Sequence, residues 1–176
     1  MRYAQIDNCE IVNGNGIGVS LYIQGCPIQC KGCFNPETWD FKGGEELTGR
    51  EEALIYHALR PPTISRFSVL GGEPLVEENL FQLNYILCTI KSVFPEKKIW
   101  IWTGYTWDEL QERRKNTTPD KLQVTFKYAD YLVAGPFIEE EKDLTLLWRG
   151  SRNQEIIDLQ KTREQEKKVV YEGQIS

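Results

Sequence analysis

Three cysteines stand close together at Cys26, Cys30 and Cys33, in the spacing CxxxCxxC. Thiolate is a soft ligand, and closely spaced thiolates select zinc, Cu(I) or an iron–sulfur cluster. Structural zinc usually closes its shell with four protein ligands, whereas a [4Fe–4S] cluster usually takes one cysteine on each of its four irons. Three thiolates on such a cluster would leave the fourth iron open to a small molecule.

The segment that carries these cysteines must wrap around one centre, so it cannot be a regular strand. Pro27 lacks a backbone donor and Gly32 tolerates unusual dihedral angles, and both suit a wrapping loop. A zinc-binding loop is the alternative, and it would need a fourth ligand. That ligand would come from Cys9, Cys88 or the single histidine, His57.

Short apolar runs at 18–23, 67–70 and 99–102 are predicted as strands, and each runs straight into a motif. The first leads into the cysteine loop, the second into Gly71-Gly72, and the third into Thr103-Gly104. Ligands of parallel α/β folds bind at the carboxyl ends of the strands. We therefore expect all three motifs to lie on one rim of the sheet.

Helices are predicted between these strands. Capping boxes at Thr48/Glu51 and Thr106/Glu109 predict helices that end near Leu59 and Arg114, and a third is expected over 78–93. Together with a strand at 131–134, closed by Gly135-Pro136, the rhythm predicts an α/β fold with a mostly parallel sheet. A full (β/α)8 barrel needs about 250 residues, so we expect an open, partial barrel.

One domain is expected over 1–176, with a lead-in at 1–16 that contains an Asn-Gly-Asn-Gly turn. A solvated loop is expected at 139–143. The charged stretch from about 156 to 176 is expected to be a tail, either a surface helix or a mobile end, with a possible short strand at 168–171.

The bulk properties are those of a soluble globular chain. Net charge is −5 and pI about 5.1, which disfavours a nucleic-acid partner. The sequence has no apolar run near 18 residues and no signal-peptide layout, so no membrane partner and a cytoplasmic location are expected. Five cysteines, three of them clustered, favour metal binding over disulfides.

An ordered set of motifs resembles the radical S-adenosylmethionine (SAM) enzymes. It is most similar to the activating proteins of the anaerobic ribonucleoside-triphosphate reductase, a family of glycyl-radical activases. The resemblance covers about residues 10–155. It is carried by Ile11-Val12-Asn13-Gly14, Gly25–Asn35, Thr38-Trp39, Gly71-Gly72-Glu73-Pro74, Ile99–Tyr105, Leu147-Trp148-Arg149-Gly150-Ser151 and Asn153-Gln154.

The resemblance implies a chemistry and its partners. Cys26, Cys30 and Cys33 would hold a [4Fe–4S] cluster with one open iron, which SAM would chelate through its amino group and carboxylate. Reductive cleavage of SAM would then generate a glycyl radical on the reductase. The electron would come from a low-potential donor such as a flavodoxin or ferredoxin.

The resemblance also implies contacts with SAM. The expected residues are Gly32, Cys33, Phe34, Gly71, Gly72, Glu73 and Thr103. Glu73 could accept a hydrogen bond from the SAM ammonium, or it could simply stand in the first turn of the following helix. Arg149 could pair with the SAM carboxylate, with the partner protein, or with a carboxylate of this chain.

Two alternative functions stay open at the level of sequence. One is a radical SAM enzyme that acts on a small molecule, as the deazaguanine-forming synthases do. Gly32, the Trp-Thr-Gly-Tyr stretch and the Trp-Arg-Gly-Ser stretch count against it. The other is a non-enzymatic zinc module. Relatives often carry an acid where this chain has Ala134, so no role is assigned to an acid at that position.

Overall fold

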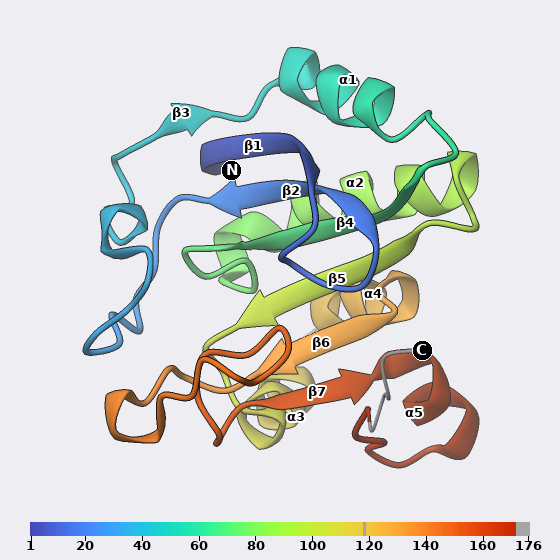
Figure 1. The fold of residues 1–176 in the computed structure, drawn as a ribbon. Coiled ribbons are helices and arrows are strands. Elements are labelled where there is room, and N and C mark those ends of the chain that lie inside the picture. The colour runs from blue at the N-terminus through green and yellow to red at the C-terminus, as the bar shows by residue number, and fades with distance from the viewer. Residues whose placement is uncertain (118, 172–176) are drawn as a thin grey trace.

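The computed structural model describes residues 1–117 and 119–171. One seven-stranded sheet runs through it, in the order β3-β1-β2-β4-β5-β6-β7 (Figure 1). The strands are β1 (Arg2–Glu10), β2 (Ile17–Ile23), β3 (Glu45–Glu46), β4 (Ile64–Gly71), β5 (Lys98–Thr103), β6 (Tyr131–Ala134) and β7 (Glu155–Asp158).

Four neighbouring strands, β2, β4, β5 and β6, are parallel. Their last residues lie in register, with Ile23 opposite Gly71 and Thr103 opposite Ala134. The loops that follow them therefore leave the sheet on one side. β1, β3 and β7 are antiparallel additions at the two edges. The predicted α/β class and the mostly parallel sheet are confirmed.

Helices connect the parallel strands. They are α1 (Gly49–Ala58), α2 (Glu77–Val93), α3 (Trp107–Asn116) and α4 (Lys121–Tyr128). A further helix, α5 (Leu159–Gln165), follows β7, and short 3-10 turns lie at Pro36–Thr38 and Glu139–Glu141. Both predicted capping boxes are present, at the starts of α1 and α3. In Figure 1, α2, α3 and α4 lie behind the sheet, while the β1–β2 loop and the segment after β6 lie in front of it.

The main core lies between the sheet and the helices. Leu21, Val69 and Ile101 from the strands pack there with Leu83 and Ile86 from α2, all fully buried. Burial of such a side chain contributes about 1.5–3 kcal/mol. A smaller cluster on the opposite face is built around Trp100, Val133 and Ile156. Both faces of the parallel strands are thus covered, as parallel sheets require.

The structure corrects the expectations at both ends of the chain. The lead-in contains β1, which pairs with β2, and the expected tail contains β7. The helix α5 agrees with the surface helix that was one of the two alternatives for this tail. α4 was not predicted. The possible strand at 168–171 is partly confirmed, because Val170 bridges Ile157. Residues 172–176 of the expected tail lie outside the described residues.

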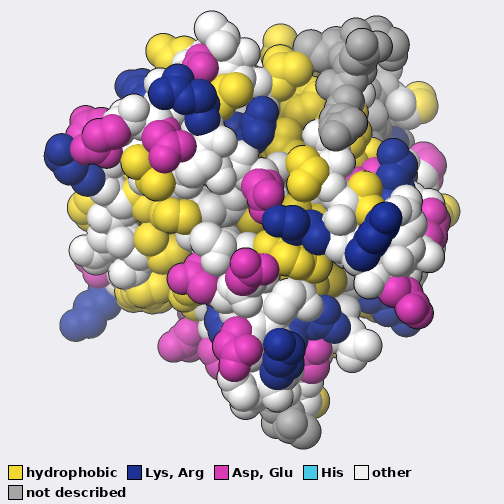
Figure 2. Space-filling model, turned by 90° about the horizontal axis from the view of Figure 1, so that it is seen from below, with side chains coloured by type: hydrophobic (Ala, Val, Ile, Leu, Met, Phe, Trp, Pro, Cys, Tyr) yellow, Lys and Arg dark blue, Asp and Glu magenta, His cyan; other side chains and the backbone are white. Residues whose placement is uncertain are grey.

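Figure 2 views the molecule from below, toward the sheet edge formed by β7. Lysine and arginine side chains alternate there with aspartate and glutamate rather than gathering in a basic stripe. No helix within the described ranges combines the length and the apolar character needed to cross a membrane.

Candidate functional site

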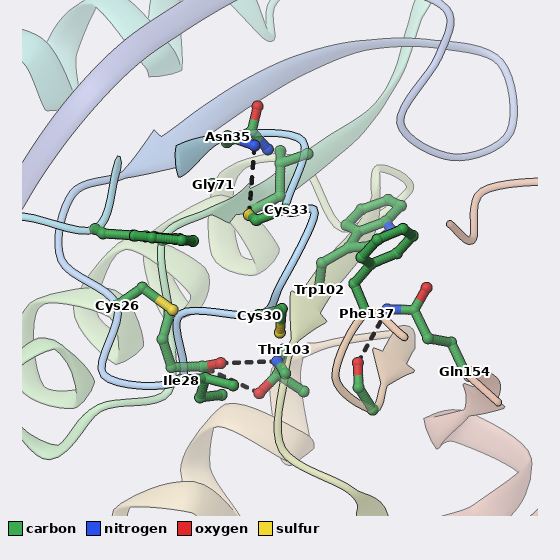
Figure 3. Close-up of a pocket in the computed structure, with 16 residues that line it drawn as sticks. Cys26, Ile28, Cys30, Cys33, Asn35, Gly71, Trp102, Thr103, Phe137 and Gln154 are labelled. Atoms are coloured by element: carbon green, nitrogen blue, oxygen red, sulfur yellow. Dashed lines mark hydrogen bonds between the residues drawn. The ribbon is translucent and has the colours of Figure 1, made fainter. Parts of the chain in front are cut away.

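Cys26, Cys30 and Cys33 line a single cavity of about 140 Å³ at the carboxyl ends of the parallel strands (Figure 3). Gly71-Gly72-Glu73 and Thr103-Gly104 line the same cavity. The prediction that these three loops share one rim is therefore confirmed.

The cysteine loop is shaped by hydrogen bonds and by two left-handed glycines. The Gly25 and Cys26 N–H groups donate to the carbonyls of Thr38 and Trp39, at 2.8 and 3.1 Å, which anchors the start of the loop. Gly25 has a φ of +98°, and a Cβ there would come within 2.4 Å of the Phe41 ring. Gly32 has a φ of +73°, so the backbone turns just before Cys33.

The thiols of Cys26 and Cys30 sit in surroundings that favour their neutral form. Burial raises the pKa of Cys26 and of Cys30. Backbone N–H groups of Ile28 and Gln29 oppose this rise at Cys26 without cancelling it. A bound cation would replace the thiol proton and stabilise the thiolate.

The arrangement does not suit a single metal ion. Across residues 1–117 and 119–171, no three His, Cys, Asp or Glu side chains are placed so that they could hold one ion. The candidates for a fourth zinc ligand lie elsewhere: Cys9 is on β1, His57 on α1 and Cys88 on α2. Cys26, Cys30 and Cys33 are soft ligands that line one cavity, and closely spaced thiolates also bind iron–sulfur clusters.

The ends of β2 and β4 approach each other very closely. The Gly72 and Glu73 N–H groups donate to the carbonyls of Ile23 and Gly25, both at 2.8 Å. A Cβ on Gly72 would lie 2.4 Å from the Gly25 oxygen, and Gly71 has a φ of +99°. Glycine is therefore required at both positions, and the Gly-Gly turn fixes the start of the cysteine loop.

Glu73 joins the ends of β4 and β5. Its side chain is fully buried. One carboxylate oxygen accepts from Leu75 N–H at 2.9 Å and from Thr103 Oγ1 at 2.8 Å, and the other accepts from Gly104 N–H at 2.8 Å. Burial raises the pKa of Glu73 to about 7 against the opposing effect of these hydrogen bonds. Since α2 begins only at Glu77, the alternative that placed Glu73 in the first helical turn is wrong.

A second cavity, of about 400 Å³, adjoins the first. The two share five lining residues: Asn35, Leu70, Trp102, Phe137 and Gln154. Phe34 lines the second cavity and not the first, and its ring packs 5.0 Å from that of Phe137. Gly32 lines neither cavity and lies against Glu139 and Phe137.

Arg149 also lines the second cavity. Its Nη1 donates to the Gln154 carbonyl at 3.0 Å, and its Nε is buried with no hydrogen-bond partner in the described structure. None of the ion pairs formed by the described residues involves Arg149. An ion pair with another of the described residues is therefore not the role that the structure gives it.

Sequence reasoning missed part of the site. Gly135, Phe137 and Gln154 line the cysteine cavity. The signal was available for the first two, because they follow the predicted strand at 131–134 just as the other motifs follow theirs. Gln154 belonged to the Asn153-Gln154 motif that carries the resemblance, but its place at this cavity was not predicted. It reaches the site because its Nε2 donates to the Gly135 carbonyl at 2.9 Å and its Oε1 accepts from Gly150 N–H at 2.8 Å.

Comparisons with known proteins agree with this geometry. The family model described as "4Fe-4S single cluster domain" matches residues 12–157. The chain is 39% identical over 158 residues to a protein of Vibrio cholerae, covering 89% of this chain and 97% of that one. It is 36% identical to a protein of Escherichia coli K12, covering 88% and 96%, and 33% identical to one of Enterobacteria phage T4, covering 89% and 93%. All three relatives are named "Anaerobic ribonucleoside-triphosphate reductase-activating protein". The chain belongs to the family of anaerobic ribonucleoside-triphosphate reductase-activating proteins.

Proposed function

We propose that this protein is a radical SAM activase that generates a glycyl radical on the anaerobic ribonucleoside-triphosphate reductase. The observation that carries the proposal is the shared cavity, in which three thiols face the Gly71-Gly72-Glu73 turn and Thr103. The names of the relatives supply the reaction class and the partner.

Cys26, Cys30 and Cys33 would each ligate one iron of a [4Fe–4S] cluster. The donor set fits this group, because thiolates are soft ligands and the three thiols line one cavity. When bound, the cluster supplies the electron that cleaves SAM to methionine and a 5′-deoxyadenosyl radical, which takes a hydrogen atom from the glycine Cα. The fourth iron has no protein ligand in this proposal, so it is open to SAM.

The neighbouring loops would position SAM. Gly71 and Gly72 expose backbone at the cavity wall, where carbonyl groups can accept from the SAM ammonium. Glu73 and Thr103 hold that wall in place through their mutual hydrogen bond. Cys33 lies beside the SAM site, Gly32 gives the loop its turn, and Phe34 borders the adjoining cavity as a surface for the nucleoside.

The finer description of the fold belongs to the same proposal. We infer an open radical SAM barrel formed as one domain over 1–176. Its support is the run of four parallel strands, joined into one sheet with β1, β3 and β7. The cavities would occupy the side of the sheet away from α2.

The remaining partners follow from the chemistry. The reaction needs a strong one-electron reductant, so we propose a low-potential donor such as a flavodoxin or ferredoxin, and a cytoplasmic location. The net charge of −5 supports a protein partner rather than a nucleic acid. Family membership supports the activase. No observation of equal weight supports either alternative, a radical SAM enzyme that acts on a small molecule or a non-enzymatic zinc module.

The test is anaerobic reconstitution with iron and sulfide, followed by reduction with dithionite in the presence of SAM. We expect 5′-deoxyadenosine and methionine, and a glycyl radical signal by electron paramagnetic resonance when the reductase is added. Cys26→Ala, Cys30→Ala and Cys33→Ala should each lose the cluster absorbance and SAM cleavage. Cys9→Ala and Cys88→Ala are the matched controls, since neither thiol lines the cavity. A cluster-loaded wild-type protein that does not cleave SAM would refute the proposal.

A further inference from the structure

Residues 11–13 lie at the second cavity and expose two apolar side chains. We name this three-residue segment the lip. Ile11 is 73% exposed and Val12 71% exposed. Val12 and Asn13 also line the second cavity. Two adjacent aliphatic side chains with this exposure leave apolar surface in water, and such surface often marks an interaction site.

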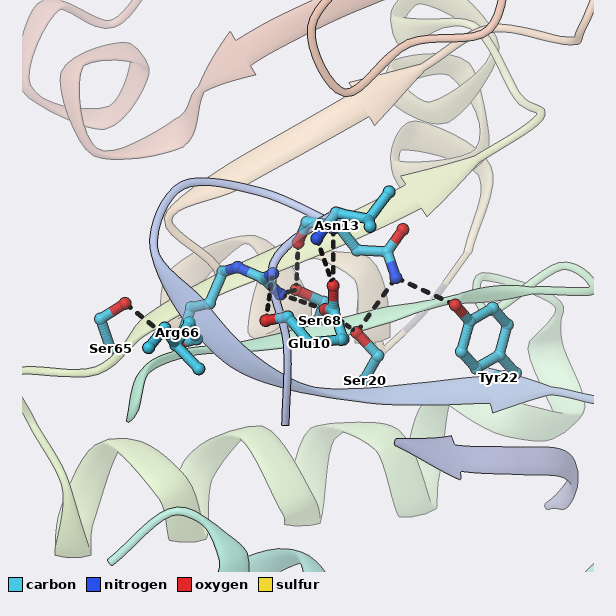
Figure 4. A network of polar contacts seen from close by, with 9 residues as sticks. Glu10, Asn13, Ser20, Tyr22, Ser65, Arg66 and Ser68 are labelled. Atoms are coloured by element: carbon cyan, nitrogen blue, oxygen red, sulfur yellow. Dashed lines mark hydrogen bonds and ion pairs between the residues drawn. The ribbon is translucent and has the colours of Figure 1, made fainter. Parts of the chain in front are cut away.

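The lip is held in place from beneath by a buried ion pair (Figure 4). Arg66 on β4 is fully buried and donates to Glu10 through Nη1 at 2.6 Å. The other Glu10 oxygen accepts from Val12 N–H at 2.5 Å and from Asn13 N–H at 3.0 Å. The charge of Arg66 thus fixes the carboxylate that binds the lip backbone.

The sheet binds the lip at further points. Ser68 Oγ donates to the Asn13 carbonyl at 2.6 Å, and Asn13 Nδ2 donates to the Tyr22 hydroxyl at 3.0 Å. The backbone of Val12 and Asn13 is therefore ordered before any partner arrives. An ordered loop loses little entropy on binding, which favours affinity.

The opposite side of the opening is also apolar. Leu144 is 77% exposed and Phe34 52% exposed, and both line the second cavity with Val12. Among the described residues that line this cavity, Arg149 is the only charged one, although the whole chain carries a net charge of −5. The second cavity shares five lining residues with the cysteine cavity. A segment that entered the second cavity would therefore reach residues that also line the cavity of the three cysteines.

We propose that the lip is a preformed docking element for a polypeptide, and that an extended, apolar segment of the partner passes between the lip and Leu144 into the second cavity. This rests on the proposed function, in which the reacting group is a glycine of a protein. An apolar segment suits this cavity, because most of the described side chains that line it are apolar and Arg149 is the one charged residue among them.

The experiment measures the dissociation constant between the cluster-loaded protein and the intact reductase by biolayer interferometry. Ile11→Asp and Val12→Asp place a charge on the lip, and we expect the dissociation constant to rise about tenfold or more. Leu54→Asp is the matched control, because Leu54 is 53% exposed on α1, and we expect its dissociation constant to stay within about twofold of the wild type. Circular dichroism and iron content check that each variant is folded and loaded.

A second variant tests the support beneath the lip. Ser68→Ala removes the donor to the Asn13 carbonyl and also an acceptor of Arg66 Nη1, while the direct contact between Glu10 and Arg66 remains available. We expect faster amide hydrogen exchange at Val12 and Asn13 and an increase of about threefold in the dissociation constant. Unchanged exchange together with unchanged binding would contradict the role of this support.

The outcomes separate the two proposals. If the wild type cleaves SAM and binds the reductase, but the lip variants bind it as tightly as Leu54→Asp does, the docking proposal is wrong and the proposed function stands. If the lip variants abolish only self-association of this chain, the lip is a contact between copies and the docking proposal is again wrong. Failure of the wild type to cleave SAM refutes the proposed function itself.

Discussion

At the scale of single residues, both oxygens of the Glu73 carboxylate are used by the protein. One accepts from the backbone N–H of Leu75 and the other from that of Gly104. The hydroxyl of Thr103 donates to the first oxygen as well. Glu73 therefore fixes the distance between two cavity-lining loops, whether or not it also contacts SAM.

Glu73→Gln should destabilise the fold by about 1–3 kcal/mol. Glutamine has a single side-chain oxygen, so the N–H of either Leu75 or Gly104 would face an NH2 group instead of an acceptor. The measurement is the free energy of unfolding from urea titration of the metal-free protein. Glu77→Gln is the control, because Glu77 pairs with Lys121 at an exposed site and such pairs contribute about 0–1 kcal/mol. Equal losses in the two variants would contradict this account of Glu73.

The sequence indicated the residue types of the site better than their contacts. The thiols and the Gly-Gly turn were predicted as cavity residues because each follows a strand. The hydrogen bonds of Glu73 were not predictable, since they depend on β4 and β5 being neighbours in space. The expected contacts of Gly32, Phe34 and Thr103 with SAM stay predictions.

At the scale of elements, the end of β1 and β4 are joined by the pair Glu10–Arg66. Burial alone would raise the pKa of Glu10, but hydrogen bonds from Arg66, Ser20 and the lip backbone outweigh it and lower the pKa from the ordinary 4.5 to about 2. A carboxyl group whose pKa is lowered by folding stabilises the folded state above its ordinary pKa. That contribution is lost as the pH falls from about 4.5 toward 2.

The wild type should therefore lose its stability advantage over Glu10→Gln in acid. At pH 7 the charged pair contributes up to about 3 kcal/mol of linkage free energy, and the difference in unfolding free energy should shrink steadily between pH 5 and 3. Urea titrations of both proteins at matched ionic strength measure it. A difference that does not change with pH would show that the charge of Glu10 is not what holds the loop.

Elements with strong local signals were predicted, and those that depend on tertiary pairing were not. The capping boxes of α1 and α3 marked both helix starts. β1 mixes polar and apolar residues without regular alternation, and β7 has only four residues, so each is stabilised mainly by its neighbour in the sheet. α4 is eight residues long, and its capping residue Asp120 was the one local signal that could have identified it.

At the scale of the whole molecule, β7 closes the sheet edge next to β6. Ile157 is fully buried and stands opposite Leu132. Some residues that the sequence predicted as a charged tail are thus part of the core. The sequence did not indicate this, because their apolar side chains were too few to stand out among the charges around them. The parallel centre of the fold was predictable, whereas both antiparallel edges were not.

Ile157→Ala should lower the free energy of unfolding by about 2–5 kcal/mol, since it leaves a cavity in the core. Gln160→Ala, on the exposed face of α5, should change it by no more than about 0.5 kcal/mol. Thermal and urea unfolding followed by circular dichroism measure both. Comparable small effects would mean that this end of the chain behaves as the tail first expected.

The opening of the second cavity is assembled from opposite ends of the sequence, with Val12 on one side and Leu144 and Arg149 on the other. During synthesis the three thiols leave the ribosome long before the segment that completes the wall beside them. Until residue 149 has emerged and folded back, any iron captured by the early segment would lie exposed to solvent and oxidants. Loading of iron after release of the finished chain is accordingly the order of events that this topology favours.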